Sequence, residues 1–250
     1  MSSMKKNETV IAVCIQEPQE DGSSMDFGLI QGDNLRFLHQ AFITDTLMSA
    51  STIQEADVRL YFVDIPERKK LVKIITDYVG KQTKGIDDGF LKNRFEKVKL
   101  EKERWGIRVE KIFEDCFKQG YKNVLVIGSR TPTVTTDMML MAVKLLSESD
   151  AVFGPTPEGR YYAIGMSGKA HIKLSEFDWK LPTIYHDVSD ALDAKGLKWS
   201  ELEIWYCVEQ PEELELAIRD INQFRFQDDE STAHETEKAL ERILSKLEME

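Results

Sequence analysis

Short apolar runs alternate with amphipathic stretches along most of this chain. Val10–Ile15, Val58–Val63 and Val124–Ile127 are rich in β-branched residues and almost wholly apolar, as is typical of strands buried on both faces of a sheet. Leu35–Met48 instead carries its apolar residues at helical spacing. This alternation predicts an α/β fold with a mostly parallel sheet and helices on both faces.

The same pattern predicts the remaining elements. Pro66 suits the first turn of a helix, because its missing N–H needs no partner there, and Gly80 fits the end of that helix after Val79. Thr135 or Thr136 can cap a later helix. Further helices are expected at Ile107–Lys118, Met138–Leu146, Val188–Ala194 and Glu212–Ile221, and further strands at Ala151–Phe153, Tyr161–Met166 and Leu202–Val208.

Two segments depart from this pattern. Residues 81–104 contain Gly85 and Gly89 and then a run of mixed charge, so both a solvated helix and a mobile flap remain open. We expect residues 1–225 to form a single domain and residues 226–250 to add an amphipathic C-terminal helix. Its predicted start is a capping box of Thr232 and Glu235.

The apolar stripe of the C-terminal helix consists of Leu240, Ile243, Leu244 and Leu247. A stripe of this kind must be covered. Either the helix lies back on its own domain, or it packs on a second subunit and makes a homo-oligomer.

Composition narrows the class of protein. The chain has 250 residues, 42% of them hydrophobic, and a net charge of −11, which gives it no general attraction for nucleic acid or for anionic membranes. Met1–Glu8 lacks an apolar signal core, and no run approaches the ~18 apolar residues of a membrane span. Three widely spaced cysteines form neither a disulfide framework nor a zinc signature. We therefore expect a cytoplasmic protein.

The most informative stretch joins two of the predicted strands. Val124–Ile127 runs directly into Gly128-Ser-Arg-Thr-Pro132, and a later strand ends at Gly154-Pro155 before Glu158-Gly-Arg-Tyr-Tyr-Ala-Ile-Gly165. Loops that follow parallel strands meet at one edge of the sheet, where α/β proteins usually bind their ligands. The sequence therefore predicts a pocket at that edge.

At these motifs the chain resembles bacterial glycosyltransferase-like proteins, of the type associated with radical-SAM and selenium-related domains, in the nucleotide-diphospho-sugar transferase superfamily. Family signatures G-S-D-x-P-T and G-P-x-x-D-G-G-Y-Y-x-I-G correspond to Gly128–Thr133 and Gly154–Gly165. A-F-x-x-D-T-L, a loosely matched L-G-E-R helix start and D-V-D-T-P-E-D-L correspond to Ala41–Leu47, Trp105–Val109 and Cys207–Leu214. The resemblance spans about Val10 to Ile221.

The resemblance implies a GT-A-like (Rossmann-like) fold, a nucleotide or nucleotide sugar as ligand, and glycosyl or nucleotidyl transfer as chemistry. It also implies a divalent metal held by an acidic residue after the central strand. Glu158 would then be the catalytic acid/base or a residual metal ligand. Nucleotide and phosphate contacts would come from Arg108, Gly128, Ser129, Arg130, Arg160 and Tyr161.

Several positions depart from the family pattern. Arg130 replaces the acidic metal ligand, Arg160 replaces a glycine, and the late acidic pair has become Cys207 and Glu209. Residues 16–32, where the family carries a basic phosphate-binding loop, contain Glu17, Glu20, Asp21 and Asp26 but no Lys or Arg. These changes argue against a bound Mg²⁺ or Mn²⁺ and leave only Glu158 and Glu209 as candidate metal ligands.

Two alternatives remain open for Arg130. It could bind phosphate directly, because a guanidinium is a planar fork of donors, or it could fill the former metal site with a salt bridge to the acidic first loop. The function is open as well. The chain is a transferase with altered metal and phosphate sites, or a catalytically inactive binding or scaffold protein that kept the fold. A third alternative is an anion sensor that uses the arginine pocket without turnover.

Overall fold

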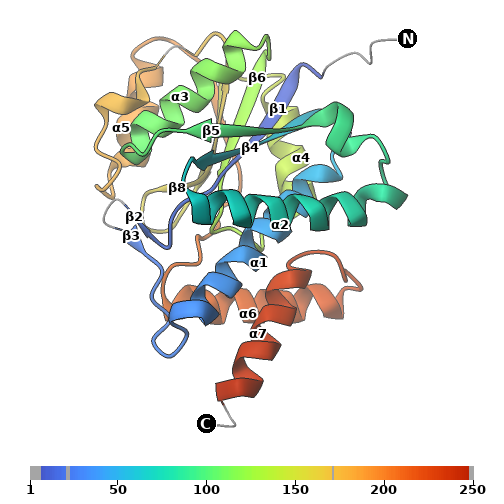
Figure 1. The fold of residues 1–250 in the computed structure, drawn as a ribbon. Helices are drawn as coiled ribbons and strands as arrows, with labels where there is room; N and C mark the ends of the chain where they lie inside the picture. Colours follow the sequence, from blue (N-terminus) through green and yellow to red (C-terminus); the bar gives the residue numbers. More distant parts are fainter. Residues whose placement is uncertain (1–6, 21–22, 171, 248–250) are drawn as a thin grey trace.

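The computed structural model describes residues 7–20, 23–170 and 172–247 and is built around one seven-stranded sheet (Figure 1). The strand order is β5-β4-β1-β6-β8-β7-β9. The bounds are β1 Thr9–Cys14, β4 Ala56–Val63, β5 Phe95–Leu100, β6 Asn123–Gly128, β7 Ala151–Pro155, β8 Tyr161–Ser167 and β9 Trp199–Glu201. A separate two-stranded ribbon, β2 Gln19–Glu20 and β3 Ser23–Ser24, lies in the first loop.

The strand directions determine where loops meet. β1 pairs parallel with both β4 and β6, β4 pairs parallel with β5, and β7 pairs parallel with β9. In the seven-stranded sheet as described, β8 is the strand that runs against its neighbours. The carboxyl ends of β1, β6 and β7 and the start of β8 therefore lie along one edge. The predicted α/β fold with a mostly parallel sheet is confirmed.

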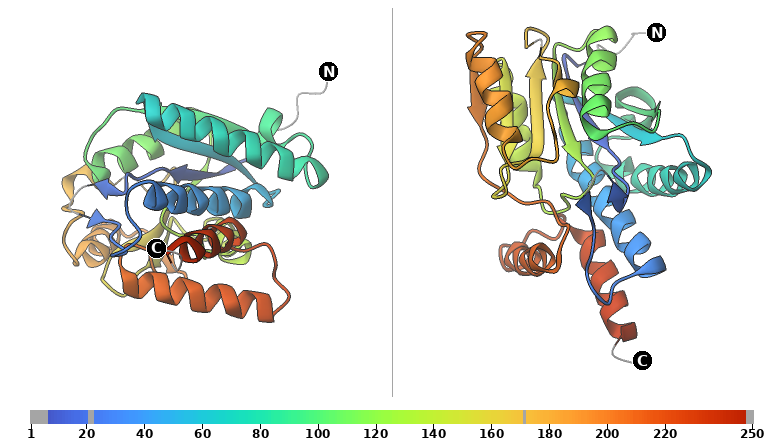
Figure 2. Two further views of the ribbon diagram at one scale, coloured as in Figure 1. Left: turned by 60° about the horizontal axis from the view of Figure 1, so that its bottom comes forward. Right: turned by 90° about the vertical axis from the view of Figure 1, so that its left-hand side faces the viewer.

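Helices cover both faces of the sheet (Figure 2). One face packs against α1 (Gly32–Ser51), α2 (Pro66–Gln82) and α4 (Thr136–Leu145). The other packs against α3 (Trp105–Lys118) and α5 (Ile184–Asp193). The first half of α1 extends beyond the sheet and forms a third cluster with α6 (Pro211–Phe226) and α7 (His234–Leu247). The predicted cap of α4 is confirmed, because the Thr135 side chain accepts from Met138 N–H at 3.2 Å.

The prediction for residues 81–104 was wrong. They form a 3₁₀ turn at Thr83–Gly85, a π-helical turn at Phe90–Arg94 and then the edge strand β5. Phe90 is buried in the core, and the Arg94 guanidinium donates to carbonyls of the α1–β4 connection. These two anchors draw the charged run against β4, where its lysines face outward along an exposed edge.

The prediction of a strand at Leu202–Val208 was also wrong. The assigned strand β9 ends at Glu201, and the following residues cross the edge of the sheet. Leu202 N–H donates to the carbonyl of Phe153, whereas Val208 N–H donates to that of Arg130. Its apolar pattern therefore reflects burial of Leu202 against the sheet and of Tyr206 and Val208 against α1 and α6, and not pairing with a single strand.

The C-terminal helix α7 lies against α1, and Leu240 and Ile243 of its apolar stripe are buried there. The predicted cap is wrong, because α7 starts at His234 and Ala233 has φ +55°. A carboxylate from α1 holds this end of the helix instead. Asp45 accepts from Glu235 N–H at 2.9 Å, from Thr236 N–H at 2.7 Å and from the Thr236 hydroxyl at 2.6 Å.

The division at residue 225 and the homo-oligomer stay predictions. Among the described residues no helix combines the length and the apolar character needed to cross a bilayer. Of the sequence predictions, the signal-free start at Met1–Lys6 and the loop acid Asp21 lie outside the described residues.

Candidate functional site

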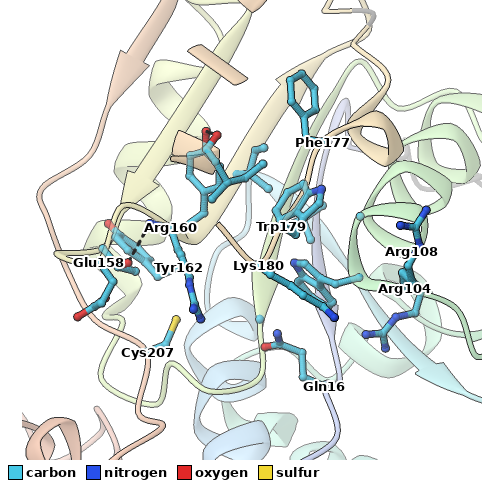
Figure 3. Close-up of a pocket in the computed structure, with 18 of the residues that line it drawn as sticks. Gln16, Arg104, Arg108, Glu158, Arg160, Tyr162, Phe177, Trp179, Lys180 and Cys207 are labelled. Atoms are coloured by element: carbon cyan, nitrogen blue, oxygen red, sulfur yellow. Dashed lines mark hydrogen bonds between the residues drawn. The ribbon is translucent and has the colours of Figure 1, made fainter. Parts of the chain in front are cut away.

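A cavity of about 700 Å³ opens at the carboxyl end of β1 and β6. Gln16, two residues after the end of β1, and Gly128, the last residue of β6, line it together with the start of α3, the β7–β8 loop and residues 175–180. Figure 3 shows Arg104 and Arg108 on one side of it and Glu158, Arg160 and Cys207 on the other. The sheet thus brings distant segments to one pocket, at the edge predicted from the sequence.

The α3 side of the pocket is cationic. Arg104 and Arg108 flank the first turn of α3, which lines the cavity, so the positive end of the helix dipole lies at the pocket. No side chain caps this turn. Arg104 is exposed, whereas Arg108 is buried with its guanidinium carbon 5.1 Å from the centroid of the Trp105 ring. This wall favours an anion.

Trp179 packs on Gly106 of α3 and lines the cavity on the same side. Its indole N–H donates to the Leu174 carbonyl at 2.8 Å, and a Cβ on Gly106 would lie 2.4 Å from the ring. Only a glycine at position 106 allows this packing. The neighbouring Lys180, an exposed residue, also lines the cavity.

The opposite wall is the turn between β7 and β8. Thr156 N–H donates to the Arg160 carbonyl at 2.9 Å, and Gly159 has φ +75° with no room for a Cβ beside the Pro182 carbonyl, which would lie 2.0 Å away. The turn presents Glu158 and Arg160 to the cavity. A carboxylate and a guanidinium therefore face the cationic wall together.

Arg130 lies beneath this pocket with a side chain that is 1% exposed. Its Nη1 donates to Glu209 Oε1 at 2.7 Å, and its Nη2 donates to the backbone carbonyl of Glu17. The second oxygen of Glu209 lies 3.8 Å from Arg160 Nη1. The guanidinium thus ties the loop after β1 to the segment that precedes α6.

Comparison with known proteins supports the resemblance seen in the motifs. Residues 68–180 match the family model described as "Uncharacterized protein conserved in bacteria (DUF2064)". A candidate nucleotide-diphospho-sugar transferase from Desulfovibrio desulfuricans G20 has a TM-score of 0.71 at 20% identity, with 96% of this chain and 98% of the other covered. The chain has the nucleotide-diphospho-sugar transferase fold.

More distant structures share this GT-A-like fold. A 4-diphosphocytidyl-2C-methyl-D-erythritol synthase has a TM-score of 0.54 at 8% identity, covering 87% of this chain and 100% of that one. For the bifunctional IspDF from Campylobacter jejuni the TM-score is 0.50 and the identity 16%, with 84% of this chain and 54% of the other covered. No curated protein sequence matches. The predicted resemblance is confirmed at the level of the fold.

The residues present do not fit the divalent cation that this fold family implies. No group of three or more His, Cys, Asp or Glu side chains in the described part of the chain is arranged to hold a metal. A divalent ion near Arg130 would meet a fixed positive charge that already neutralises the Glu209 carboxylate, so the pair offers the ion no net negative charge. Burial and then the nearby Glu209 raise the pKa of the Cys207 thiol, so it remains protonated.

Two predicted phosphate contacts, Ser129 and Arg130, lie below the cavity and do not line it. The Ser129 hydroxyl accepts from Gln16 N–H at 3.0 Å and lies 3.3 Å from His39 Nε2. Burial, then the charges of Arg68 and Arg130, lower the pKa of His39 well below its usual range. This layer supports the pocket through internal contacts.

The other predicted residues line the cavity: Arg108, Gly128, Glu158, Arg160, Tyr161 and Glu209. Tyr161 contributes a ring face, because its hydroxyl donates to the Tyr185 carbonyl at 3.0 Å. The sequence reasoning missed Arg104. Arg104 directly precedes the Trp105–Val109 motif and is the N-cap residue of α3. Its place at the start of a helix predicted to face the pocket was the feature that could have identified it.

Proposed function

We propose that this chain binds the diphosphate of a nucleotide or nucleotide sugar in the pocket at the carboxyl edge of its sheet, and that it is a sugar or nucleotidyl transferase in type. The observation that carries the proposal is the cationic wall of Arg104, Arg108 and Lys180 in a cavity of about 700 Å³. A diphosphate needs such compensation where no metal provides it. The neighbours of the same fold include proteins named as a nucleotide-diphospho-sugar transferase and a 4-diphosphocytidyl-2C-methyl-D-erythritol synthase.

The geometry suggests how such a ligand would lie. Its phosphates would contact Arg104, Lys180 and the first N–H groups of α3, and its nucleoside would rest near Gly128 and Gln16. The transferred group would then face Glu158 and Arg160 on the opposite wall. Glu158 is exposed and could accept the proton of an attacking hydroxyl as that hydroxyl displaces the phosphate.

A second candidate is a binding protein of the same fold that performs no transfer. The specific observation in its favour is the ion pair of Arg130 and Glu209, which stands where the family resemblance places acidic metal ligands. In both cases a nucleotide occupies the same pocket, so binding is tested first and turnover second. Cys14, Cys116 and Cys207 are present as thiols, which fits a reducing cytoplasm, the location we propose.

The test of binding is a thermal-shift screen of nucleoside diphosphates and their sugar conjugates. The best compound is then titrated against the variants Arg104→Ala and Lys180→Ala. We expect at least a tenfold weakening for each, because one charge-assisted contact is worth about 1.4 kcal/mol or more. Lys73→Ala is the matched control, since Lys73 is an exposed lysine on α2 and does not line the cavity.

Stabilisation by one nucleotide class, weakened by the two pocket variants and unchanged in the control, supports the proposal. If no compound raises the unfolding temperature, the nucleotide site is wrong. If binding is found, incubation of the bound nucleotide sugar with candidate acceptors and detection of the released nucleotide distinguishes the transferase from the binding protein.

A further inference from the structure

We infer that the Arg130 guanidinium takes the place of a divalent cation and acts as a positioning residue. Without metal it orders the floor of the pocket, by which we mean the loop after β1, the loop after β6 and residues 207–209. This deepens the proposed function, because it states how the same pocket would bind a diphosphate. It is tested without any nucleotide, so the two can fail separately.

The first step is the position of Arg130 in the fold. It follows the end of β6 by two residues, and its side chain is buried beneath the cavity. Its own backbone carbonyl accepts from Val208 N–H at 2.8 Å. Main chain and side chain together therefore hold the loop after β6 against the segment that carries Cys207 and Glu209.

The second step is what the guanidinium joins. It reaches Glu209 in the segment before α6 with one nitrogen and the Glu17 carbonyl after β1 with another. A metal ion at the meeting point of strand ends would link the same loops through their oxygens. Here a fixed positive charge does so with hydrogen bonds of defined direction.

The carboxylates near Arg130 contact arginines. Glu209 contacts Arg130 through one oxygen and lies 3.8 Å from Arg160 through the other. The Glu17 carboxylate forms an ion pair with Arg68. Glu209 and Glu17, the two acidic residues that Arg130 joins, therefore both have arginine partners.

The consequence concerns the ligand. Because Arg130 lies below the cavity and does not line it, phosphate contacts fall to the side chains of the pocket itself, such as Arg104 and Lys180, while Arg160 faces the transferred group. Arg130 fixes the position of Glu209, and Glu209 in turn limits the freedom of Arg160. Binding by such a pocket is independent of Mg²⁺ and Mn²⁺.

The experiment is a titration of the ligand-free protein with Mn²⁺, followed by the electron paramagnetic resonance signal of the free ion. We expect the wild-type chain to leave the signal unchanged. Arg130→Asp removes the guanidinium and brings a second carboxylate toward Glu209. We therefore expect this variant to bind about one equivalent of Mn²⁺ per chain and so to reduce the signal of the free ion. The double variant Arg130→Asp/Glu209→Gln is expected to lose that binding.

Two results would overturn the inference. One is saturable binding of a single Mn²⁺ by the wild-type chain that Glu209→Gln abolishes, because a cation would then share the site with Arg130. The other is a folded Arg130→Asp variant, with unchanged circular dichroism, that leaves the signal as the wild type does. In that case the guanidinium is not what excludes the ion. The wild-type titration decides the first point even if the variant fails to fold.

Discussion

Nη1 of Arg130 donates to Oε1 of Glu209 at 2.7 Å beneath the pocket. The resemblance to the nucleotide-diphospho-sugar transferase superfamily implies acidic ligands for a metal at this edge of the sheet. A buried arginine and one remaining carboxylate now neutralise each other there. The contact therefore explains how the chain keeps the strand-end loops together while it lacks a set of metal ligands among the described residues.

Loss of the Glu209 carboxylate is expected to destabilise the fold. Breaking a buried ion pair by removing one partner costs roughly 3 to 5 kcal/mol, and Glu209→Gln should lie at the lower end because its side chain is 21% exposed. Arg130→Met should cost less, since the carboxylate left behind keeps access to solvent and to Arg160. Unfolding in urea measures both. A negligible loss for Glu209→Gln would show that the pair does not hold the floor together.

The contact between α1 and α7 is expected to make stability depend on pH. Burial raises the pKa of Asp45 from 3.8 to about 7, although hydrogen bonds from Thr236 and Glu235 oppose the shift. The folded protein then binds a proton that the unfolded chain has released between about pH 4 and about pH 7. Stability is therefore highest below this range and falls as the pH rises through it, by about 1.4 kcal/mol per unit at most.

This pH dependence is measured by urea unfolding at several pH values within that range. Asp45→Asn carries no titrating group and should show a clearly flatter profile, whatever its absolute stability. Equal slopes for the two proteins would mean that Asp45 is ionised throughout and that its three donors outweigh burial.

Gly106→Ala tests the packing of Trp179 over the cationic wall. The added methyl would meet the indole at 2.4 Å and the Leu174 carbonyl at 3.0 Å, and overpacking of this kind costs about 1 to 3 kcal/mol. That loss exceeds the gain of up to ~1 kcal/mol that alanine brings to a helix. We expect a lower unfolding temperature and a red-shifted tryptophan emission.

Gly85→Ala is the matched control for this substitution. No atom lies within 4 Å of a Cβ built at Gly85, so the variant should be neutral within about 0.5 kcal/mol. If both variants behave alike, Trp179 does not pack on α3 as described.

The fold could be predicted from the sequence where burial alone decides the pattern. β1, β4 and β6 are covered on both faces, and their continuous apolar runs show this directly. β5 could not be recognised, because an edge strand buries few of its residues and reads as a charged surface segment. Leu202–Val208 misled for the opposite reason, since an irregular segment buried against the sheet and against α1 and α6 has the same apolar pattern as a strand.

The sequence predicted which edge of the sheet carries the site but not which side chains line the cavity and which lie beneath it. The motifs predicted that Glu158, Arg160 and Arg108 lie at the carboxyl edge of the sheet, and all three line the cavity there, because strand order fixes where their loops meet. It did not show that Ser129 and Arg130, next to Gly128, turn below the cavity. Whether a side chain points into a pocket or under it depends on the partner across the gap. For Arg130 that partner is Glu209, 79 positions away in sequence.

Isothermal titration of the best nucleotide from the screen, once with excess Mn²⁺ and once with a chelator, tests a metal-free nucleotide pocket most directly. We predict the same affinity in both conditions, and a loss of at least tenfold in Lys180→Ala. Binding that requires Mn²⁺ and disappears with the chelator would contradict a pocket in which Arg130 and Glu209 have replaced the metal.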